Sequence, residues 1–353
     1  MTTASPALPA GAAHFARMHG FDPATCKQVP GGRNNRVYRV EATDGAPAAL
    51  KLYFQHPEDH RDRWHSEATF LDYATGRGIA AVPRVIARER TVAATLLEWI
   101  DGDAMTTAML RPSHVEAAVA LLADLNPASG PNQHQNQHQD DVVLPSAAEA
   151  CFSRATHCAM VTNRVAALVE TARSDAIAPD LSDFIGRELA PATQTLVDRI
   201  AALPGAHTEP LPAAGRCVSP SDLGFHNALI DRAGRVRFVD FEYAGWDDPA
   251  KLICDFWLQP QCPIDPTWRA PFATQVAEWL GDAGHGAPDA LLQRVAQLAP
   301  LYALKWCCIV LNPLLAVARE RRRFAGNDEA EQLATARRLL GEAEQLASTD
   351  PLL

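Results

Sequence analysis

The sequence has 353 residues, of which 47% are hydrophobic and 21% charged, so it can bury a large core and is long enough for two lobes. Its formal net charge of −10 argues against a nucleic-acid-binding protein, which normally carries a basic face. The acidic balance is compatible with cationic small substrates but does not select them.

Membrane and secretory classes are also disfavoured. The N-terminus, "MTTASPALPAGAAHFARMHG", lacks the basic start and apolar run of a secretory signal. The apolar stretch "LAPLYALKWCCIVLNPLLAVA" is interrupted by Lys305, Asn312 and Pro313, which favours a buried helix over a membrane span. The eight cysteines form no CxxC pair, so reduced thiols are expected instead of a zinc site. We expect a soluble, cytoplasmic protein.

The first hundred residues predict a small β-sheet with one helix against it. Alternating or apolar runs at 35–42, 48–54, 82–89 and 91–100 predict strands. Residues 61–78, which end in glycines, predict the helix. We therefore place an N-terminal lobe, with its N-terminal extension, at residues 1–100.

Helical periodicity dominates the remainder, which we assign to a second lobe at residues 101–353. Ser113 with Glu116, and Ser146 with Glu149, have the spacing of capping boxes and predict two helix starts. The fold class is therefore α+β, with a small sheet lobe followed by a larger, mostly helical one.

A predicted hairpin at 228–239 interrupts the helices and carries oxygen ligands at one end. Asp222 and Asn227 precede its first strand, and Asp240 follows its second strand. Pairing of the strands brings these residues together. Asn227 and Asp240 are hard oxygen ligands that suit Mg²⁺ with bound phosphates, while Asp222 can orient a hydroxyl and receive its proton. The alternative is that Asp222 and Asn227 only cap turns.

Lys51 lies in the middle of the apolar strand "AALKLYF", where a charge needs a partner. Only four of the 32 basic residues are lysine. An ammonium that contacts phosphate oxygens and pairs with Glu67 of the following helix explains the position. The alternative is an edge-strand lysine that extends to water.

The segment "PGGRNNRVYRV" places Gly31, Gly32 and Asn34 at a turn between strands. Glycines let backbone N–H groups approach an anion, as a loop over a nucleotide must, although any hairpin can hold a Gly-Gly pair. The sequence contains no GxxxxGK[ST] motif and is not a P-loop protein.

These motifs together resemble the aminoglycoside phosphotransferase and choline kinase family, part of the protein-kinase-like superfamily. The resemblance spans "GGRNNRVYRV", "LKLYF", "WHSEATFL", "LLEWIDG", "SPSDLGFHNALI" and "FVDFEYAGWDDPAKLICDF". It implies a protein-kinase-like two-lobed fold with Lys51 and Glu67 as the phosphate-positioning pair. Asp222 is then the catalytic carboxylate, and Asn227 and Asp240 are the metal ligands.

The same resemblance implies further assignments. "LLEWIDG" corresponds to the hinge, with Leu97, Glu98 and Trp99 as candidates for adenine contacts, although a plain strand end explains them almost equally well. Asp255 resembles a structural helix-capping residue. One departure is Pro220, which stands where the family usually has His two positions before the catalytic Asp.

The leading interpretation is an ATP- and Mg²⁺-dependent kinase that phosphorylates a hydroxyl of a small molecule. The acceptor can be a sugar, an aminosugar, an amino alcohol or an aminoglycoside-like compound. A few aromatic and acidic residues after the hairpin could line its pocket: Glu242, Tyr243, Trp246 and Asp247. Two alternatives are a catalytically silent nucleotide-binding regulatory protein on the same fold and a purely structural helical protein. The oligomeric state is left open.

Overall fold

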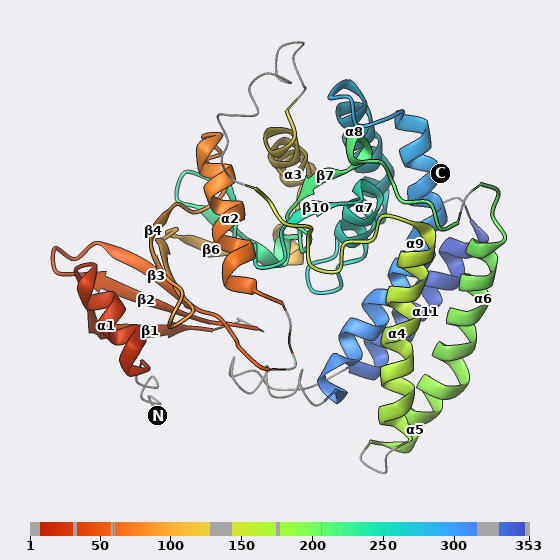
Figure 1. The fold of residues 1–353 in the computed structure, drawn as a ribbon, viewed down its shortest axis with the longest axis horizontal. Coiled ribbons are helices and arrows are strands. Elements are labelled where there is room, and N and C mark those ends of the chain that lie inside the picture. Colours follow the sequence, from red (N-terminus) through yellow and green to blue (C-terminus); the bar gives the residue numbers. More distant parts are fainter. Residues whose placement is uncertain are drawn as a thin grey trace.

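The computed structural model describes residues 8–30, 34–57, 59, 61–127, 143–173, 177–205, 207–315 and 332–349. An antiparallel sheet with two helices forms one side of the molecule, and most of the helices form the other (Figure 1). The predicted α+β class with a small N-terminal sheet lobe and a larger helical lobe is confirmed.

The N-terminal sheet has five strands in the order β1-β2-β3-β5-β4, each antiparallel to its neighbour. Its strands are β1 (Phe21–Val29), β2 (Arg36–Ala42), β3 (Pro47–Leu52), β4 (Val85–Glu89) and β5 (Ala94–Glu98). Helix α2 (Arg63–Gly76) corresponds to the predicted helix, and α1 (Ala10–Met18) precedes the sheet. The predicted strands are present, although the observed ones are shorter.

Register within β3 explains why a lysine is buried there. Leu50 and Leu52 pack into a small apolar core with Tyr38 and Leu96. Because successive side chains of a strand point to opposite faces, Lys51 lies on the other face of the sheet, opposite Thr95 of β5. That face is the one from which Lys51 reaches Glu67 of α2.

The helical lobe is built around α9, which packs against five other helices, α4, α6, α7, α8 and α11. Its helices are α3 (Pro112–Leu125), α4 (Arg154–Ala172), α5 (Pro179–Asp183), α6 (Ala190–Ala201), α7 (Pro249–Leu258), α8 (Arg269–Asp282), α9 (Pro288–Leu311) and α11 (Gln332–Ser348). Among the described residues, one segment, Pro288–Leu314, is long and apolar enough to cross a membrane. The apolar window of this segment is 72% buried within the fold, as in the core helix of a globular protein.

The predicted hairpin is present as β8 (Ala228–Asp231) and β9 (Val236–Phe238). Strand β6 (Gly102–Ala104) extends it to a three-stranded sheet, and β7 (Cys217–Ser219) pairs with β10 (Gly245–Asp247) beside it. The N–H of Phe238 donates to the carbonyl of Ala81, which ties the hairpin to the loop before β4. Asp240, just past β9, reaches Lys51 of β3, so this end of the hairpin meets the N-terminal sheet.

Both predicted capping boxes are wrong. Helix α3 begins at Pro112, whose fixed φ suits the first helical position, so Ser113 is already inside the helix. Ser146 forms an isolated bridge with Trp246 outside any helix. The capping box lies later, where Ser153 accepts from the N–H of Thr156 and the Thr156 hydroxyl accepts from the N–H of Ser153.

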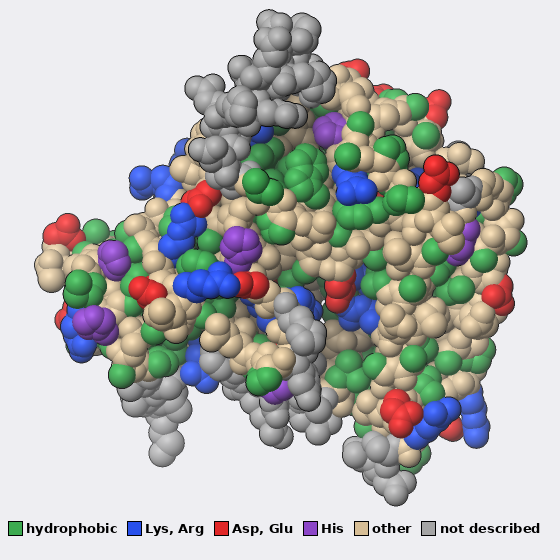
Figure 2. All heavy atoms as spheres, in the orientation of Figure 1, with side chains coloured by type: hydrophobic (Ala, Val, Ile, Leu, Met, Phe, Trp, Pro, Cys, Tyr) green, Lys and Arg blue, Asp and Glu red, His purple; other side chains and the backbone are tan. Residues whose placement is uncertain are grey.

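We propose a lobe boundary near residue 100, where the sheet ends. The small core lies between α1 and the sheet, while Phe70 and Leu71 of α2 belong to the large core of the helical lobe. Helix α2 therefore connects the two lobes by packing. On the face drawn in Figure 2, acidic and basic side chains lie side by side where the sheet part meets the helical part.

We predict that Ser153→Ala destabilises the protein by about 1 kcal/mol, because the first turn of α4 loses its side-chain acceptor. Ser113→Ala, at an exposed position without a capping bond, is the matched control and should change stability by less than about 0.5 kcal/mol. Urea denaturation of both variants measures the difference. Equal losses in the two variants would contradict the assignment of the cap.

Candidate active site

The centre of the site is a buried ammonium bound by two carboxylates. Lys51 Nζ lies 2.6 Å from Glu67 Oε2 and 2.5 Å from Asp240 Oδ1. Burial would lower the pKa of Lys51, but the charges of Asp240 and Glu67 outweigh burial and hold this pKa well above its ordinary value. The predicted Lys51–Glu67 contact is present, and Lys51 is only 4% exposed, so it is not an edge lysine in contact with water.

Glu67 is held by three donors from two segments, the end of β3 and the residues after the hairpin. Besides Lys51, the hydroxyl of Tyr53 donates to Oε2 and the backbone N–H of Phe241 donates to Oε1. The ring of Phe241 stacks on Phe70 of α2, with ring centroids 4.6 Å apart. Helix α2 and the segment after the hairpin are therefore fixed to each other by packing and by hydrogen bonds.

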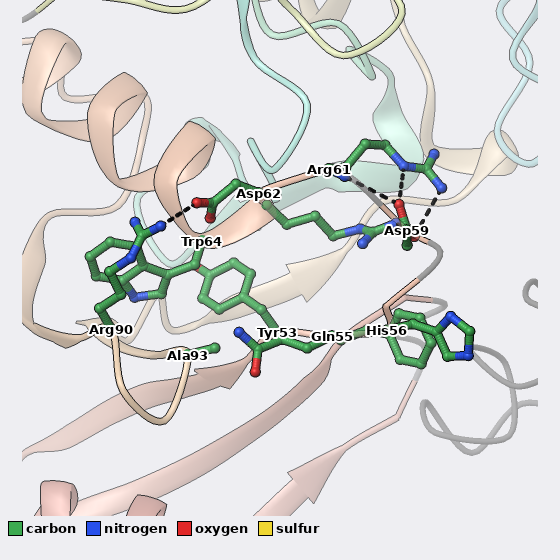
Figure 3. A pocket seen from close by; sticks show the side chains of 11 residues that line it. Tyr53, Gln55, His56, Asp59, Arg61, Asp62, Trp64, Arg90 and Ala93 are labelled. Atoms are coloured by element: carbon green, nitrogen blue, oxygen red, sulfur yellow. Dashed lines mark hydrogen bonds and ion pairs between the residues drawn. The ribbon is translucent and has the colours of Figure 1, made fainter.

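Two cavities lie near this centre. The larger, about 290 Å³, lies beside the N-terminus of α2, where Arg61 binds Asp59 and Arg90 binds Asp62 (Figure 3). The smaller cavity, about 130 Å³, is lined by Asp222 and other residues of the helical lobe and by Asn34 and Arg61 of the N-terminal lobe. We call it the acceptor cleft, and we consider it the candidate site because Asp222 opens into it.

Asp222 and Asn227 lie together, as predicted. Asn227 Nδ2 donates to the backbone carbonyl of Asp222 at 3.1 Å and lies 3.4 Å from its carboxylate. His226 Nε2 lies 3.5 Å from Asp222 Oδ1. Burial alone would raise the pKa of Asp222, but the charge of His226 and its hydrogen bond to the carboxylate bring this pKa below its ordinary value. The carboxylate is therefore ionised near neutral pH.

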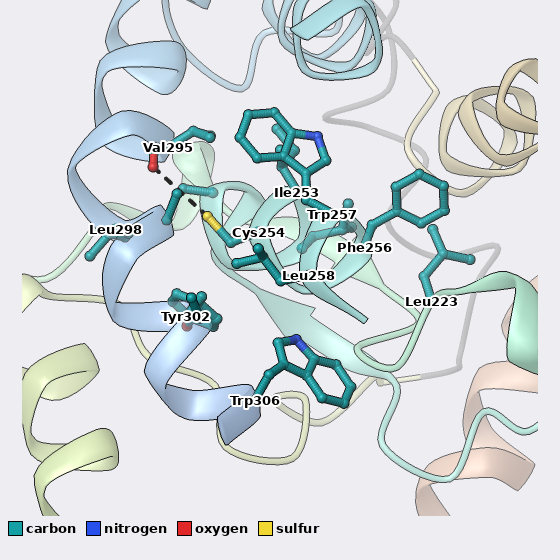
Figure 4. Close-up of a cluster of buried hydrophobic side chains, with 14 of the residues drawn as sticks. Leu223, Ile253, Cys254, Phe256, Trp257, Leu258, Val295, Leu298, Tyr302 and Trp306 are labelled. Carbon is teal, nitrogen blue, oxygen red and sulfur yellow. Dashed lines mark hydrogen bonds between the residues drawn. The ribbon is translucent and has the colours of Figure 1, made fainter. Parts of the chain in front are cut away.

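The loop that carries Asp222 is anchored on both sides. Leu223 packs beside Phe256 of α7 in the core of the helical lobe (Figure 4). Lys251 Nζ donates to Ser221 Oγ at 3.0 Å. Ser221 has φ 63°, a left-handed conformation that costs a non-glycine residue about 1–3 kcal/mol and persists only where surrounding contacts impose it.

A chain of buried charges behind this loop is not predicted by the sequence motifs. Lys251 binds Asp247 at 2.6 Å and lies 3.4 Å from Asp255, and Lys305 of α9 binds both oxygens of Asp255. The expectation that Asp255 caps a helix is wrong, because Asp255 lies inside α7 and its carboxylate is used by the two lysines. Asp248 is the residue that caps α7, through the N–H of Ala250. The rarity of lysine was the available signal, since Lys51, Lys251 and Lys305 are all buried.

Asn34 contacts the site through its side-chain amide. Its Nδ2 donates to Glu242 Oε1 at 2.7 Å and to the hydroxyl of Tyr243 at 2.9 Å. Burial raises the pKa of Glu242, and the nearby Asp240 raises it further. Gly31 and Gly32 lie outside the described residues. Of the four post-hairpin residues considered for the acceptor pocket, only Tyr243 lines the cleft, while Glu242 and Asp247 are buried in other contacts and Trp246 is exposed elsewhere.

The predicted hinge residues end β5. Leu97 is buried in the sheet between Ala49 and Val85. The carboxylate of Glu98 accepts from the N–H of Arg84 and lies 3.3 Å from Arg237. The side chains of Leu97 and Glu98 are therefore engaged in the fold, and contact with a base by either residue would come from the backbone. Adenine binding by Leu97, Glu98 and Trp99 stays a prediction.

A small sheet with a buried Lys–Glu pair, joined through Asp240 to a hairpin flanked by Asp and Asn side chains, is the arrangement of kinase-like phosphotransferases. Residues 25–298 match the model of the phosphotransferase enzyme family, and the chain belongs to that family. It is a kinase-type phosphotransferase with a hydroxyl acceptor, as its motifs indicate. No curated protein matches the sequence significantly.

Solved structures share the fold at low sequence identity. Choline kinase from Cryptosporidium parvum is 13% identical, with a TM-score of 0.59 over 93% of this chain and 89% of that chain. The choline kinase LicA from Streptococcus pneumoniae is 15% identical, with a TM-score of 0.57 over 92% and 94%. Spectinomycin phosphotransferase in complex with ADP and spectinomycin is 12% identical, with a TM-score of 0.57 over 97% and 100%. The protein-kinase-like fold is thus confirmed.

We predict that Lys51→Met destabilises the protein by about 3–5 kcal/mol, because Glu67 is then left buried without its counter-charge. Adding Glu67→Gln to Lys51→Met should restore part of that loss, since the uncompensated carboxylate is removed. Urea denaturation of both single variants and the double variant forms the cycle. Losses that simply add would show that the pair is not coupled.

Proposed function

We propose that this protein transfers the γ-phosphoryl group of ATP to a hydroxyl of a small molecule, with Mg²⁺ as the metal ion. The observation that carries the proposal is the convergence of Asp222, Asn227 and Asp240 at one end of the hairpin, where Asp240 binds Lys51 and Asp222 opens into the acceptor cleft. Phosphoryl transfer depends mainly on positioning and charge stabilisation, which these groups can supply.

Lys51 is the residue that holds the nucleotide phosphates. Its ammonium is kept charged by Glu67 and Asp240, and its position is set by the register of β3. The Glu67 contacts to Tyr53 and Phe241 keep the ammonium directed at the region between the lobes. Gly31, Gly32 and Asn34 are proposed to cover the phosphates, and the backbone of Leu97, Glu98 and Trp99 to contact adenine.

Asp240 and Asn227 have the chemistry of a Mg²⁺ site. The Asp240 side chain is 34% exposed, and its second oxygen is not used by Lys51. The Nδ2 of Asn227 donates to the carbonyl of Asp222. The amide oxygen of Asn227 takes no part in that bond and remains available as a ligand. One carboxylate and one amide oxygen fit Mg²⁺, which keeps most of its ligands as water and phosphate. When bound, Mg²⁺ would neutralise charge on the phosphates.

Asp222 orients the acceptor hydroxyl and receives its proton. The bond from the acceptor oxygen to the γ-phosphorus forms as the bond from that phosphorus to the ADP oxygen breaks, and the hydroxyl proton passes to the carboxylate. The contacts to His226 and Asn227 fix the carboxylate, and the lowered pKa keeps it ionised before the reaction.

Several features favour a small acceptor. The cleft measures only about 130 Å³, and ten residues separate Asp240 from Lys251 of α7, which leaves little chain for a protein-binding segment. The silent-protein alternative rests on Pro220, but Lys251 and Leu223 hold the loop from other directions. We also propose a cytoplasmic location, in agreement with eight free cysteines.

We predict different defects for the two aspartates. Asp222→Asn should lower turnover by about 10²–10⁴-fold and largely preserve Mg·ATP affinity, since only the proton acceptor is lost. Asp240→Ala should weaken Mg·ATP binding as well as turnover, because a metal ligand is removed. Nucleotide titration and coupled ADP release over hydroxylated metabolites measure both properties. Near-normal turnover of Asp222→Asn would contradict the assigned role.

We predict that kcat at saturating Mg·ATP has no acid limb from Asp222 between pH 6 and 9. The pKa of Asp222 is lowered, so its active carboxylate form is lost only as pH falls below the ordinary aspartate range. A pH profile of kcat for the wild type, at saturating acceptor, checks this, and an acid limb inside this range that Asp222→Glu displaces would contradict the prediction. His226→Gln removes the group that lowers the pKa of Asp222, so this variant should lose activity at a higher pH than the wild type.

A further inference from the structure

We propose that the acceptor carries an anionic group, a carboxylate or a phosphate monoester, that is bound by Arg61, Arg164 and Lys305 while its hydroxyl meets Asp222. This inference rests on the proposed function and adds the charge class of the substrate. All three cations line the acceptor cleft together with Asp222. They come from three separate segments: the residues before α2, helix α4 and helix α9.

The charged groups of Arg61, Arg164 and Lys305 line the cleft, whereas two of the three carboxylates that bind them lie behind it. The side chains of Arg61 and Arg164 are 35% and 19% exposed. The partners of Arg61 and Lys305 are Asp59 and Asp255, whose side chains are only 3% and 2% exposed. An acceptor in the cleft therefore meets the cations more directly than it meets these carboxylates.

Glu149 is the remaining acidic residue of the cleft apart from Asp222, and it is already neutralised. Both of its oxygens accept hydrogen bonds from Arg164 Nη2, and Arg61 Nη1 lies 3.9 Å away. Burial would raise the pKa of Glu149, but the charge of Arg164 and its hydrogen bonds bring it to about 2. Glu149 is thus ionised, paired and poorly suited to attract a cationic acceptor.

The guanidinium groups keep donors for a ligand beyond these pairs. Arg164 uses one nitrogen, Nη2, for Glu149, so its Nε–H and Nη1–H₂ groups take no part in that pair. Arg61 binds Asp59 through Nε and Nη2, while its Nη1 lies 3.9 Å from Glu149, too far for a hydrogen bond to that carboxylate. Guanidinium donors arranged in this way suit the two oxygens of a carboxylate or phosphate.

The aromatic rings of the cleft are occupied by the protein's own cations. Lys305 Nζ lies 5.5 Å from the centre of the Trp306 ring, and the guanidinium of Arg61 lies 5.9 Å from that of Tyr243. A quaternary ammonium would need such ring faces or an unpaired carboxylate. Bringing a second cation to these rings would instead place like charges together. The cleft therefore disfavours choline-like acceptors.

The test compares matched compounds that differ in charge. Two series serve: glucose, glucosamine, glucuronate and glucose 6-phosphate, and glycerol, ethanolamine, glycerate and glycerol 3-phosphate. Calorimetry in the presence of Mg²⁺ and a non-hydrolysable ATP analogue measures binding, and coupled ADP release measures turnover. We expect an anionic member to bind at least about tenfold more tightly than its neutral counterpart. Comparison of glucuronate with glucose 6-phosphate, and of glycerate with glycerol 3-phosphate, shows whether a carboxylate or a phosphate monoester binds more tightly.

Variants identify the residues that recognise the charge. Arg164→Gln should weaken binding of the anionic compound by about 10–100-fold and leave the KM for Mg·ATP unchanged. Arg173→Gln, an exposed arginine at the end of the same helix, is the control and should change neither. Arg164→Gln leaves Glu149 with a weaker partner, so the double variant Glu149→Gln/Arg164→Gln repeats the test without an unpaired carboxylate. The separate variant Arg61→Gln tests a second cation of the cleft independently.

The outcomes separate this inference from the proposed function. Preference for an anion that is lost in the Arg164 and Arg61 variants supports the inference even if no compound is phosphorylated, in which case the proposed function fails. Phosphorylation with preference for a neutral or cationic member overturns the inference and leaves the function standing. No binding by any anionic member also overturns it. A larger effect of Arg164→Gln on Mg·ATP than on the acceptor would assign the cations to the nucleotide instead.

Discussion

The structure of the site depends on the burial of one ammonium group. A lysine in the middle of an apolar strand is stable only if carboxylates reach it, because an unpaired buried charge costs several kcal/mol. Lys51 is met by Glu67 from α2 and by Asp240 from the end of the hairpin. A single pairing requirement therefore fixes the sheet, the helix and the Asp240 end of the hairpin relative to one another. Phe241, which donates to Glu67 and stacks on Phe70, extends that constraint into the core of the helical lobe.

The helical lobe repeats the same device. Lys251 and Lys305 share Asp255, and Lys251 also binds Asp247 and the hydroxyl of Ser221. Three of the four lysines in the chain are thus buried, and each of them is bound to at least one buried carboxylate. Ion pairs of this kind contribute little net stability, but removal of one partner is severe, so they specify geometry more than they add free energy. Here they hold the strained Ser221, and with it Asp222, against α7 and α9.

Local patterns predicted the parts of the structure that depend on local constraints. Alternation located the strands, and the spacing of Asp222, Asn227 and Asp240 around a hairpin required only that two adjacent strands pair. The two capping-box predictions were wrong because nearby residues offered the chain a different local structure. Pro112 begins α3 one residue before Ser113, and Ser146 pairs with Trp246 of a strand instead of starting a helix. The cations of the cleft could not be predicted by spacing at all. Arg61, Arg164 and Lys305 meet only because the fold brings α4, α9 and the residues before α2 to one cleft, which is a property of the whole tertiary structure.

This difference separates the chemistry of the site from its specificity. The hairpin, Lys51 and Glu67 are proposed to serve the phosphate donor, and their arrangement follows from short-range pairing and one buried charge. The proposed acceptor cleft takes Arg61, Arg164 and Lys305 from the loop before α2, from α4 and from α9, and none of these three residues is part of that pairing. In this chain those elements place arginine and lysine against the cleft and neutralise Glu149. The net charge of −10 therefore says little about the acceptor, because the charge that an acceptor meets is set by a few buried pairs and not by the surface of the whole molecule.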